Sequence, residues 1–339
     1  MTLAQQITER KKALGSRLCI LAHHYQSDAV VRHADILGDS LELARRIDGL
    51  TAEHIVFCGV HFMAETAAIL ARPEQKVHIP DTGASCVMAD MAPAPLVETV
   101  ITALNREGAR IIPLTYVNSS AAVKAVCGSN GGSVCTSANA ATMLRWALGQ
   151  GDGVIFLPDA NLGRNTARTL GIKEDEIKRL DVRGAGSLIA PASPAKRLYL
   201  WPGLCAIHAK FHPEQITRLR AAHPEALVLV HPECSPDVVN AADGAGSTSY
   251  LIKAVAEARS GATIFVGTEW NLVNRLKDRH PDKDIRPLRT ALCSNMAKIT
   301  EENLARTLQG LDTASPVRVD ENIAEPARLA LERMLDACR

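Results

Sequence analysis

The sequence predicts an α/β protein made of three homologous αβα-layer domains, whose parallel sheets surround a pseudo-threefold axis. Short blocks of similar sequence recur three times in the same order, which is the signature of an internal repeat. Each repeat opens on a β-rich apolar run, as expected for a strand buried in a parallel sheet. Hydrophobic residues make up 47% of the chain and charged residues 22%, a composition typical of a packed core rather than of intrinsic disorder.

Two of the four recurring blocks predict the strands. The first block is an apolar run that ends in polar side chains, at residues 18–26, 110–118 and 227–234. The third block is a second strand that leads into a turn and a helix, at residues 55–65, 154–163 and 264–272. In parallel α/β units, functional groups collect beyond the carboxyl ends of the strands. Those ends carry His23, Tyr25, Tyr116, Asn118, His231 and Glu233.

The other two blocks predict helix starts and a set of equivalent cysteines. In the second block, Ser or Thr precedes residues with helical spacing, a pattern typical of a helix N-terminus. We therefore expect helices to start at Ser40, Ser137 and Thr248. The fourth block contributes one cysteine to each repeat: Cys86, Cys205 and Cys293.

The repeats divide the chain into domains at residues 1–92, 93–206 and 207–295, and residues 296–339 could pack back on the first domain. Cys205 follows Cys86 by 119 residues, but Cys293 follows Cys205 by only 88, so the second domain contains an insertion. We place it at about residues 167–196. There, a Lys/Glu/Arg-rich helix pattern precedes a segment rich in Gly, Ala, Pro and Ser, which predicts a surface excursion.

Charge and composition exclude several classes of partner and location. The 38 Lys and Arg residues nearly cancel 37 Asp and Glu residues, so no basic field favours nucleic acid or an anionic membrane. The N-terminus lacks the apolar region of a secretory signal, and no apolar run approaches the roughly 18 residues that span a bilayer. We therefore expect a soluble, cytoplasmic protein. Nine cysteines, an odd number, argue against a disulfide framework.

The three equivalent cysteines predict a metal centre if the repeats pack around a common axis. Thiolates are suitable ligands for iron–sulfur clusters, zinc or copper(I). Three thiolates on a four-iron cluster would leave one iron open to substrate as a Lewis acid. The spacing is equally compatible with buried cysteines that pack as small hydrophobic residues.

Eight short motifs, in order between about residues 18 and 300, resemble those of the quinolinate synthase (NadA) family. They lie at residues 22–26, 38–41, 116–120, 135–139, 201–205, 231–234, 246–249 and 267–269. The resemblance implies three α/β domains and a [4Fe-4S] cluster held by Cys86, Cys205 and Cys293. It also implies condensation of iminoaspartate with dihydroxyacetone phosphate, with loss of phosphate and water, to give quinolinate for NAD biosynthesis.

The resemblance further implies roles for individual residues. The catalytic set is Tyr25, Tyr116, His231 and Glu233. Substrate binding falls to His23, Ser40, Tyr116, Asn118, Ser137, His208, His231, Glu233 and Thr248. Helix starts at Ser40, Ser137 and Thr248 would attract phosphate or carboxylate through free N–H groups. His24 departs from the family, which commonly has an aromatic residue at this position.

Two alternative functions remain open from the sequence. One is a three-cysteine zinc hydrolase that activates water, and the other is a cluster-bearing sensor or scaffold without turnover. Functional coupling to an L-aspartate oxidase that hands over iminoaspartate is also open.

Overall fold

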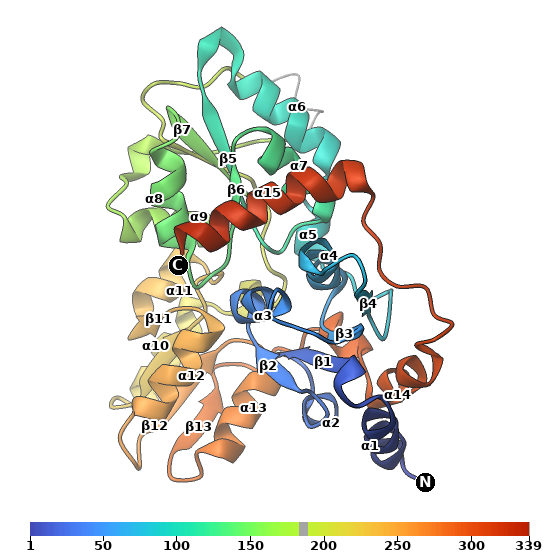
Figure 1. The fold of residues 1–339 in the computed structure, drawn as a ribbon. Coiled ribbons are helices and arrows are strands. Elements are labelled where there is room, and N and C mark those ends of the chain that lie inside the picture. Colours follow the sequence, from blue (N-terminus) through green and yellow to red (C-terminus); the bar gives the residue numbers. More distant parts are fainter. Residues whose placement is uncertain (183–188, 339) are drawn as a thin grey trace.

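The computed structural model describes residues 1–182 and 189–338 and confirms the predicted fold class (Figure 1). The described strands form three separate sheets in which every pairing is parallel. The first sheet has the order β2-β1-β3-β4, the second β6-β5-β7-β9-β8 and the third β11-β10-β12-β13. Apart from the additional strand β8, the strands of the three sheets are connected along the chain in the same way, as expected for three homologous units.

The strands occupy the following positions along the chain. The first sheet contains β1 (Leu18–His23), β2 (Ile36–Gly38), β3 (His54–Cys58) and β4 (Lys76–His78). The second contains β5 (Ile111–Tyr116), β6 (Ser133–Cys135), β7 (Gly153–Leu157), β8 (Ile177–Arg179) and β9 (Leu198–Leu200). The third contains β10 (Leu227–Val230), β11 (Gly244–Ala245), β12 (Thr263–Gly267) and β13 (Asp284–Pro287).

Helices surround the sheets, so every residue of the inner strands β1, β3, β5 and β7 is buried. The first unit contains α1 (Leu3–Leu14), α2 (Asp28–Val31), α3 (Ser40–Ile47), α4 (His61–Leu70) and α5 (Val87–Asp90). The second contains α6 (Ala94–Leu104), α7 (Ala121–Ser129), α8 (Ala140–Leu148) and α9 (Ala160–Thr169). The third contains α10 (Pro213–Ala222), α11 (Pro236–Ala241), α12 (Thr248–Glu257) and α13 (Trp270–Arg279). Burial on both faces explains why these strands are almost continuously apolar.

The insertion in the second unit adds a strand to its sheet, and the helix predicted there is wrong. The segment forms a short 3-10 turn at Glu174–Glu176 and then β8, which pairs with β9 at the edge of the sheet. Ile177 is buried, whereas Arg179 is exposed, as expected for an edge strand that carries charge on its open side. Residues 183–188 of the insertion lie outside the described residues.

The predicted helix starts are confirmed at two of three positions. α3 begins at Ser40 and α12 at Thr248, and the capping side chains are those of the preceding residues, Asp39 and Ser247. The third prediction is wrong, because α8 begins at Ala140 rather than at Ser137. The Asn139 side-chain oxygen accepts the backbone N–H of Thr136 at 2.6 Å, which holds residues 136–139 in a turn before the helix.

The C-terminal helices run across the first two units (Figure 1). α14 (Glu301–Gly310) packs against α1, and α15 (Glu321–Ala337) lies along α7 and also touches α4. A glycine makes this close approach possible, because a Cβ on Gly128 would lie only 1.8 Å from the carbonyl oxygen of Pro326. The domain limits stay a prediction. Among the described residues, no helix is both long and apolar enough to cross a membrane.

Candidate active site

One cavity is lined by residues from all three units, and it contains every site residue predicted from the sequence. The space not filled by atoms is about 920 Å³, including the part open to solvent. The predicted residues in its wall are His23, Tyr25, Ser40, Cys86, Tyr116, Asn118, Ser137, Cys205, His208, His231, Glu233, Thr248 and Cys293.

The parallel sheets explain why these residues meet. β1 ends at His23 and β5 at Tyr116, and His231 directly follows β10. Ser40 and Thr248 start the helices that follow β2 and β11. Because parallel strands end at the same edge of a sheet, each unit presents its polar strand ends on one side. The cavity lies where those three edges face one another.

Inside the cavity, the Glu233 side chain hydrogen-bonds one of two stacked histidines. Its Oε2 lies 2.7 Å from His208 Nδ1, and the ring of His208 stacks on that of His231 with centroids 4.4 Å apart. Burial raises the pKa of Glu233, but electrostatic interaction with the His208 and His231 rings and hydrogen bonds with His208 and Tyr116 outweigh it and hold the pKa below its usual range. Burial, with repulsion from His208, lowers the pKa of His231 to about 3. Glu233 is therefore ionised, and His231 is neutral near pH 7.

Both tyrosines remain protonated near neutral pH. Burial raises the pKa of Tyr25 and of Tyr116 well above its ordinary value, and the charge of Glu233 adds to the effect. The Tyr116 hydroxyl hydrogen-bonds Glu233, and the Tyr25 hydroxyl lies 2.9 Å from Oγ1 of Thr268. Burial likewise lowers the pKa of His23 to about 3, so the ring that faces the cavity beside Tyr25 is uncharged.

The three equivalent cysteines share one local conformation. The backbone N–H four residues after each cysteine donates to its carbonyl, at 3.2 Å for Cys86 and 2.9 Å for both Cys205 and Cys293. Each thiol also accepts from the backbone N–H groups two and three residues later: Met88 and Ala89, Ile207 and His208, and Asn295 and Met296. Such donors stabilise a thiolate and are the kind of contact that tunes a metal-bound sulfur.

The charges of these thiols act on one another. Burial raises the pKa of Cys86 to about 12, and a charge on Cys293 would raise it further. Burial raises the pKa of Cys205 well above its usual value, and a charge on Cys86 contributes. Without a cation, the thiols keep their protons, whereas a bound metal would favour the thiolates. A second group with metal-ligand chemistry consists of Cys205, His208 and Glu233, whose ligand atoms lie within 4.8 Å of one another.

The comparison with known proteins agrees with this arrangement. The family described as quinolinate synthetase A protein matches residues 5–336. Quinolinate synthase from Herpetosiphon aurantiacus is 47% identical over 98% of this chain and 92% of its own length. The corresponding proteins of Halalkalibacterium halodurans and Corynebacterium glutamicum are 46% and 44% identical, each over 98% of this chain and over 93% and 87% of their own lengths.

The chain belongs to the quinolinate synthase family. His24, which we expect to differ from the family motif, is buried and lies outside the cavity wall, with Nε2 3.8 Å from a Glu42 oxygen. Thr268 contacts Tyr25 but is not among the site residues predicted from the sequence. It belongs to the motif at residues 267–269, but no spacing in the sequence separates it from an ordinary buried threonine.

Anion binding in this cavity depends on groups other than basic side chains. Among the described residues in its wall, none is Lys or Arg. The wall instead offers the N-termini of α3 and α12, hydroxyl groups and imidazoles. The side-chain oxygen of Asn118 is buried and has no hydrogen-bond partner among the described residues, so this oxygen can accept an N–H or O–H group of a ligand.

The remaining cysteines have no comparable surroundings. Cys19, Cys58, Cys127, Cys135 and Cys234 are buried free thiols that do not line the cavity. Burial raises the pKa of Cys58 to about 12, with no other contribution. Cys338 lies at the end of α15, where its sulfur accepts a hydrogen bond from the Asn139 amide at 3.3 Å. The three cavity thiols are thus set apart by their position and by two backbone donors each, whereas Cys127 and Cys234 have one.

Proposed function

We propose that this chain condenses iminoaspartate with dihydroxyacetone phosphate to form quinolinate in de novo NAD biosynthesis, with a [4Fe-4S] cluster on Cys86, Cys205 and Cys293. The observation that carries the proposal is the equivalence of the three cysteines. They come from three repeats, share one local conformation and line one cavity together with an ionised carboxylate. Family membership supports the same reaction.

The residues present are suited to hold such a cluster. Three thiols each receive two backbone N–H donors, and every one of them faces the same cavity. When bound, a [4Fe-4S] cluster with three protein ligands supplies a Lewis acid that assists loss of water. The substrates would then bind in the part of the cavity that the cluster does not occupy.

The substrates bring two carboxylates and a phosphate, and the cavity wall has a suitable chemistry for them. The Asp39 and Ser247 side chains already accept N–H groups in the first turns of α3 and α12, so anionic oxygens would be received by the remaining N–H groups next to Ser40 and Thr248. Ser137 and Asn118 add neutral donors from the second unit. Hydrogen bonds from neutral groups to the anionic substrates suit a site in which the bound cluster and Glu233 are themselves charged.

Proton transfers would fall to Glu233, His231 and the two tyrosines. Glu233 is ionised and can accept a proton, while neutral His231 can accept one next to it. Tyr116 keeps its proton and can stabilise an oxygen that gains negative charge. These roles make Glu233 the first candidate for the general base.

We include in the proposal a cytoplasmic location and a supply of iminoaspartate by an L-aspartate oxidase. The described cysteines are all free thiols, which suits a reducing compartment. If an L-aspartate oxidase supplies iminoaspartate, then the oxidase together with L-aspartate should support quinolinate formation without added iminoaspartate.

A second candidate function is favoured by the group formed by Cys205, His208 and Glu233. A single zinc ion there would make the protein a hydrolase that activates water. The bond between His208 and Glu233 counts against this function, because it occupies one ligand atom of each residue.

Anaerobic purification, with iron, zinc and acid-labile sulfide measured before an assay for quinolinate, tests both candidates. We expect iron and sulfide in equal amounts and quinolinate from the two substrates. Zinc without sulfide, together with no quinolinate from an iron-reconstituted sample, would overturn the proposal in favour of the hydrolase. Iron and sulfide without quinolinate would instead favour the sensor or scaffold.

A further inference from the structure

Thr268 connects two residues of the proposed catalytic set. It directly follows β12 in the third unit and is completely buried. Its Oγ1 lies 2.9 Å from the hydroxyl of Tyr25, which comes from the first unit, and 3.3 Å from Nε2 of His208. His208 in turn contacts Glu233 at 2.7 Å. A single hydroxyl group thus completes a chain from Tyr25 to Glu233.

Several donors and acceptors meet around this hydroxyl. The Glu233 carboxylate can only accept, so Nδ1 of His208 donates to it. Nε2 of the same ring faces Thr268, and a hydroxyl can both donate and accept, so Thr268 can bond Tyr25 and His208 at the same time.

These contacts hold the Tyr25 side chain at the cavity wall. The hydroxyl of Thr248 also hydrogen-bonds Tyr25. Two threonines of the third unit, one at the start of α12 and one directly after β12, therefore position a tyrosine of the first unit.

We propose that Thr268 is a positioning residue of this enzyme, which holds the Tyr25 hydroxyl and the His208 ring in place for the substrate by bonding both at once. This inference rests on the proposed function, because it assigns Tyr25 to the substrate of that reaction. It adds to the site a residue that contacts the substrate only through its neighbours.

Substitution of Thr268 by Val and by Ser separates the hydroxyl group from the shape of the side chain. Val keeps the branched shape but removes both hydrogen bonds, and we expect kcat/KM for quinolinate formation to fall about 10- to 100-fold. Ser keeps the hydroxyl, and we expect it to restore activity to within about threefold of wild type. Iron and sulfide content should not change in either variant, because Thr268 contacts no cysteine of the cluster set.

A double-variant cycle then asks whether Thr268 acts through Tyr25. In a Tyr25→Phe background the hydroxyl that Thr268 bonds is gone, so Thr268→Val should cause little further loss. Thr66→Val is the matched control, since this buried threonine bonds to the Phe62 carbonyl within α4 and lies outside the cavity wall. It should retain wild-type kcat/KM.

The outcomes separate this inference from the proposed function. A reconstituted wild-type protein that forms no quinolinate refutes the function itself. An active wild type with an equally active Thr268→Val variant refutes the role of Thr268, and losses that simply add in the double variant refute its action through Tyr25. If Thr268→Val does not fold, Thr268→Ala compared with Thr268→Ser makes the same test.

Discussion

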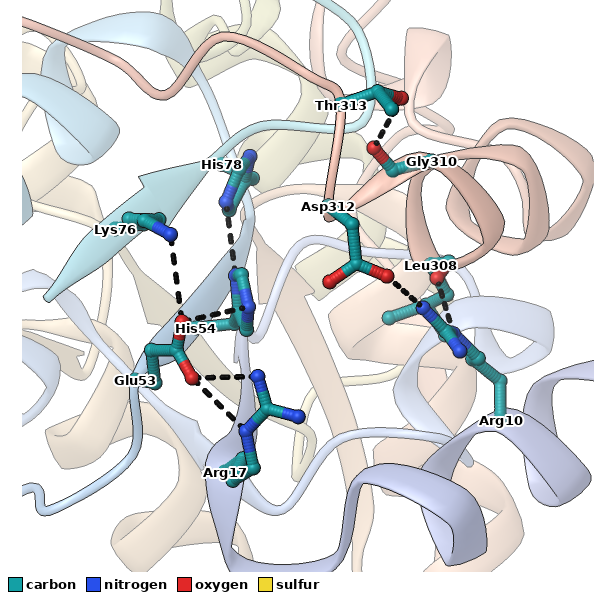
Figure 2. Close-up of polar contacts among 10 residues, drawn as sticks. All are labelled: Arg10, Arg17, Glu53, His54, Lys76, His78, Leu308, Gly310, Asp312 and Thr313. Carbon is teal, nitrogen blue, oxygen red and sulfur yellow. Dashed lines mark hydrogen bonds and ion pairs between the residues drawn. The ribbon is translucent and has the colours of Figure 1, made fainter.

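The molecule contains two groups of buried histidines whose surroundings differ sharply. His23, His208 and His231 lie in the cavity between the three units, while His54 and His78 lie at the edge of the first sheet (Figure 2). Burial lowers the pKa of His23 and His231 to about 3 and that of His78 to about 4. A buried histidine with a lowered pKa therefore occurs in both groups.

The edge group is bordered by ion pairs within the first unit, and nearby Arg10 pairs with Asp312 of the C-terminal segment at 3.0 Å. His54 Nδ1 and His78 Nε2 lie 3.3 Å apart, and Glu53 approaches His54 at 3.5 Å (Figure 2). Arg17 pairs with Glu53 at 2.7 Å. Next to this group, the backbone N–H of Val317 donates to the carbonyl of Val77 in β4 at 2.7 Å, which extends the edge of the sheet.

The comparison shows that a buried histidine beside a carboxylate does not by itself mark a catalytic site. His208 and Glu233 share their cavity with strand ends from three units and with thiols. His54 opens β3, so it lies at the amino end of its strand, and salt bridges to Arg17 and Lys76 already pair its carboxylate neighbour. Position in the sheet, and the presence of thiols and strand ends from three units around the cavity group, distinguish the two.

The largest effect is expected from the cavity thiols. Cys205→Ser should abolish both the cluster and quinolinate formation, because an alcohol is a poor ligand for iron in place of a thiolate. Cys19→Ala is the matched control, since this buried cysteine lies at the opposite end of the strand that ends in His23. It should keep the iron, the sulfide and the activity.

Metal content and product formation in the two variants check this prediction together. A Cys205→Ser protein with full iron and sulfide would remove this residue from the ligand set. Equal loss in both variants would mean that general destabilisation, rather than ligation, explains the result.

The next effect compares the carboxylates of the two histidine groups. Glu233→Gln should keep the visible absorption of the cluster but lower kcat about 100-fold or more, because an amide cannot accept the proton. Glu53→Gln changes the same functional group beside His54, and we expect kcat to remain at the wild-type value. Steady-state rates of both variants at equal cluster content provide the measurement. Wild-type turnover in Glu233→Gln would contradict its assignment as the base.

Much of this cavity could be predicted from the sequence because the repeats carry it. Apolar runs that end in polar residues indicate parallel strands, and strands of this kind place those residues at one edge. The three equivalent cysteines follow the same logic, since homologous units place equivalent positions around one axis. The individual roles of Tyr25 and Tyr116 came from the family resemblance, because tyrosines at strand ends are otherwise common.

The features that sequence did not predict depend on contacts between distant residues. Thr268 meets Tyr25 across 243 positions, and a threonine after an apolar strand has no spacing that signals this contact. Residues 172–180 have a charged pattern typical of an exposed helix, but pairing with β9 determines their structure as an edge strand. Tertiary pairing of this kind overrides local preference when the segment is short.

A smaller effect concerns stability at low pH and distinguishes the edge group. The pKa of a histidine in the unfolded chain is about 6.5, whereas burial, with repulsion from His54 and Lys76, lowers the pKa of His78 to about 4. Between these values, the unfolded chain binds a proton that the folded protein does not. Stability is thus complete above pH 6.5 and falls toward pH 4, by on the order of 2–3 kcal/mol.

The variant His78→Gln removes this titration but keeps a polar side chain beside His54. Urea unfolding of wild type and variant between pH 7 and 4 should show that the wild type loses more stability as the pH falls. Parallel curves would mean that His78 is already protonated in the fold or that the edge group opens at low pH. Quinolinate formation at pH 7 should be the same in both proteins.

The smallest effect is expected at the rim of the same group. The Arg17 side chain is 56% exposed, so water and salt screen its ion pair with Glu53. Arg17→Ala should lower the melting temperature by less than about 3 °C, and added salt should reduce the difference. A larger decrease in melting temperature that salt does not reduce would show that this ion pair holds the buried histidines in place. The edge group would then resemble the cavity, because its stability would depend on one charged contact.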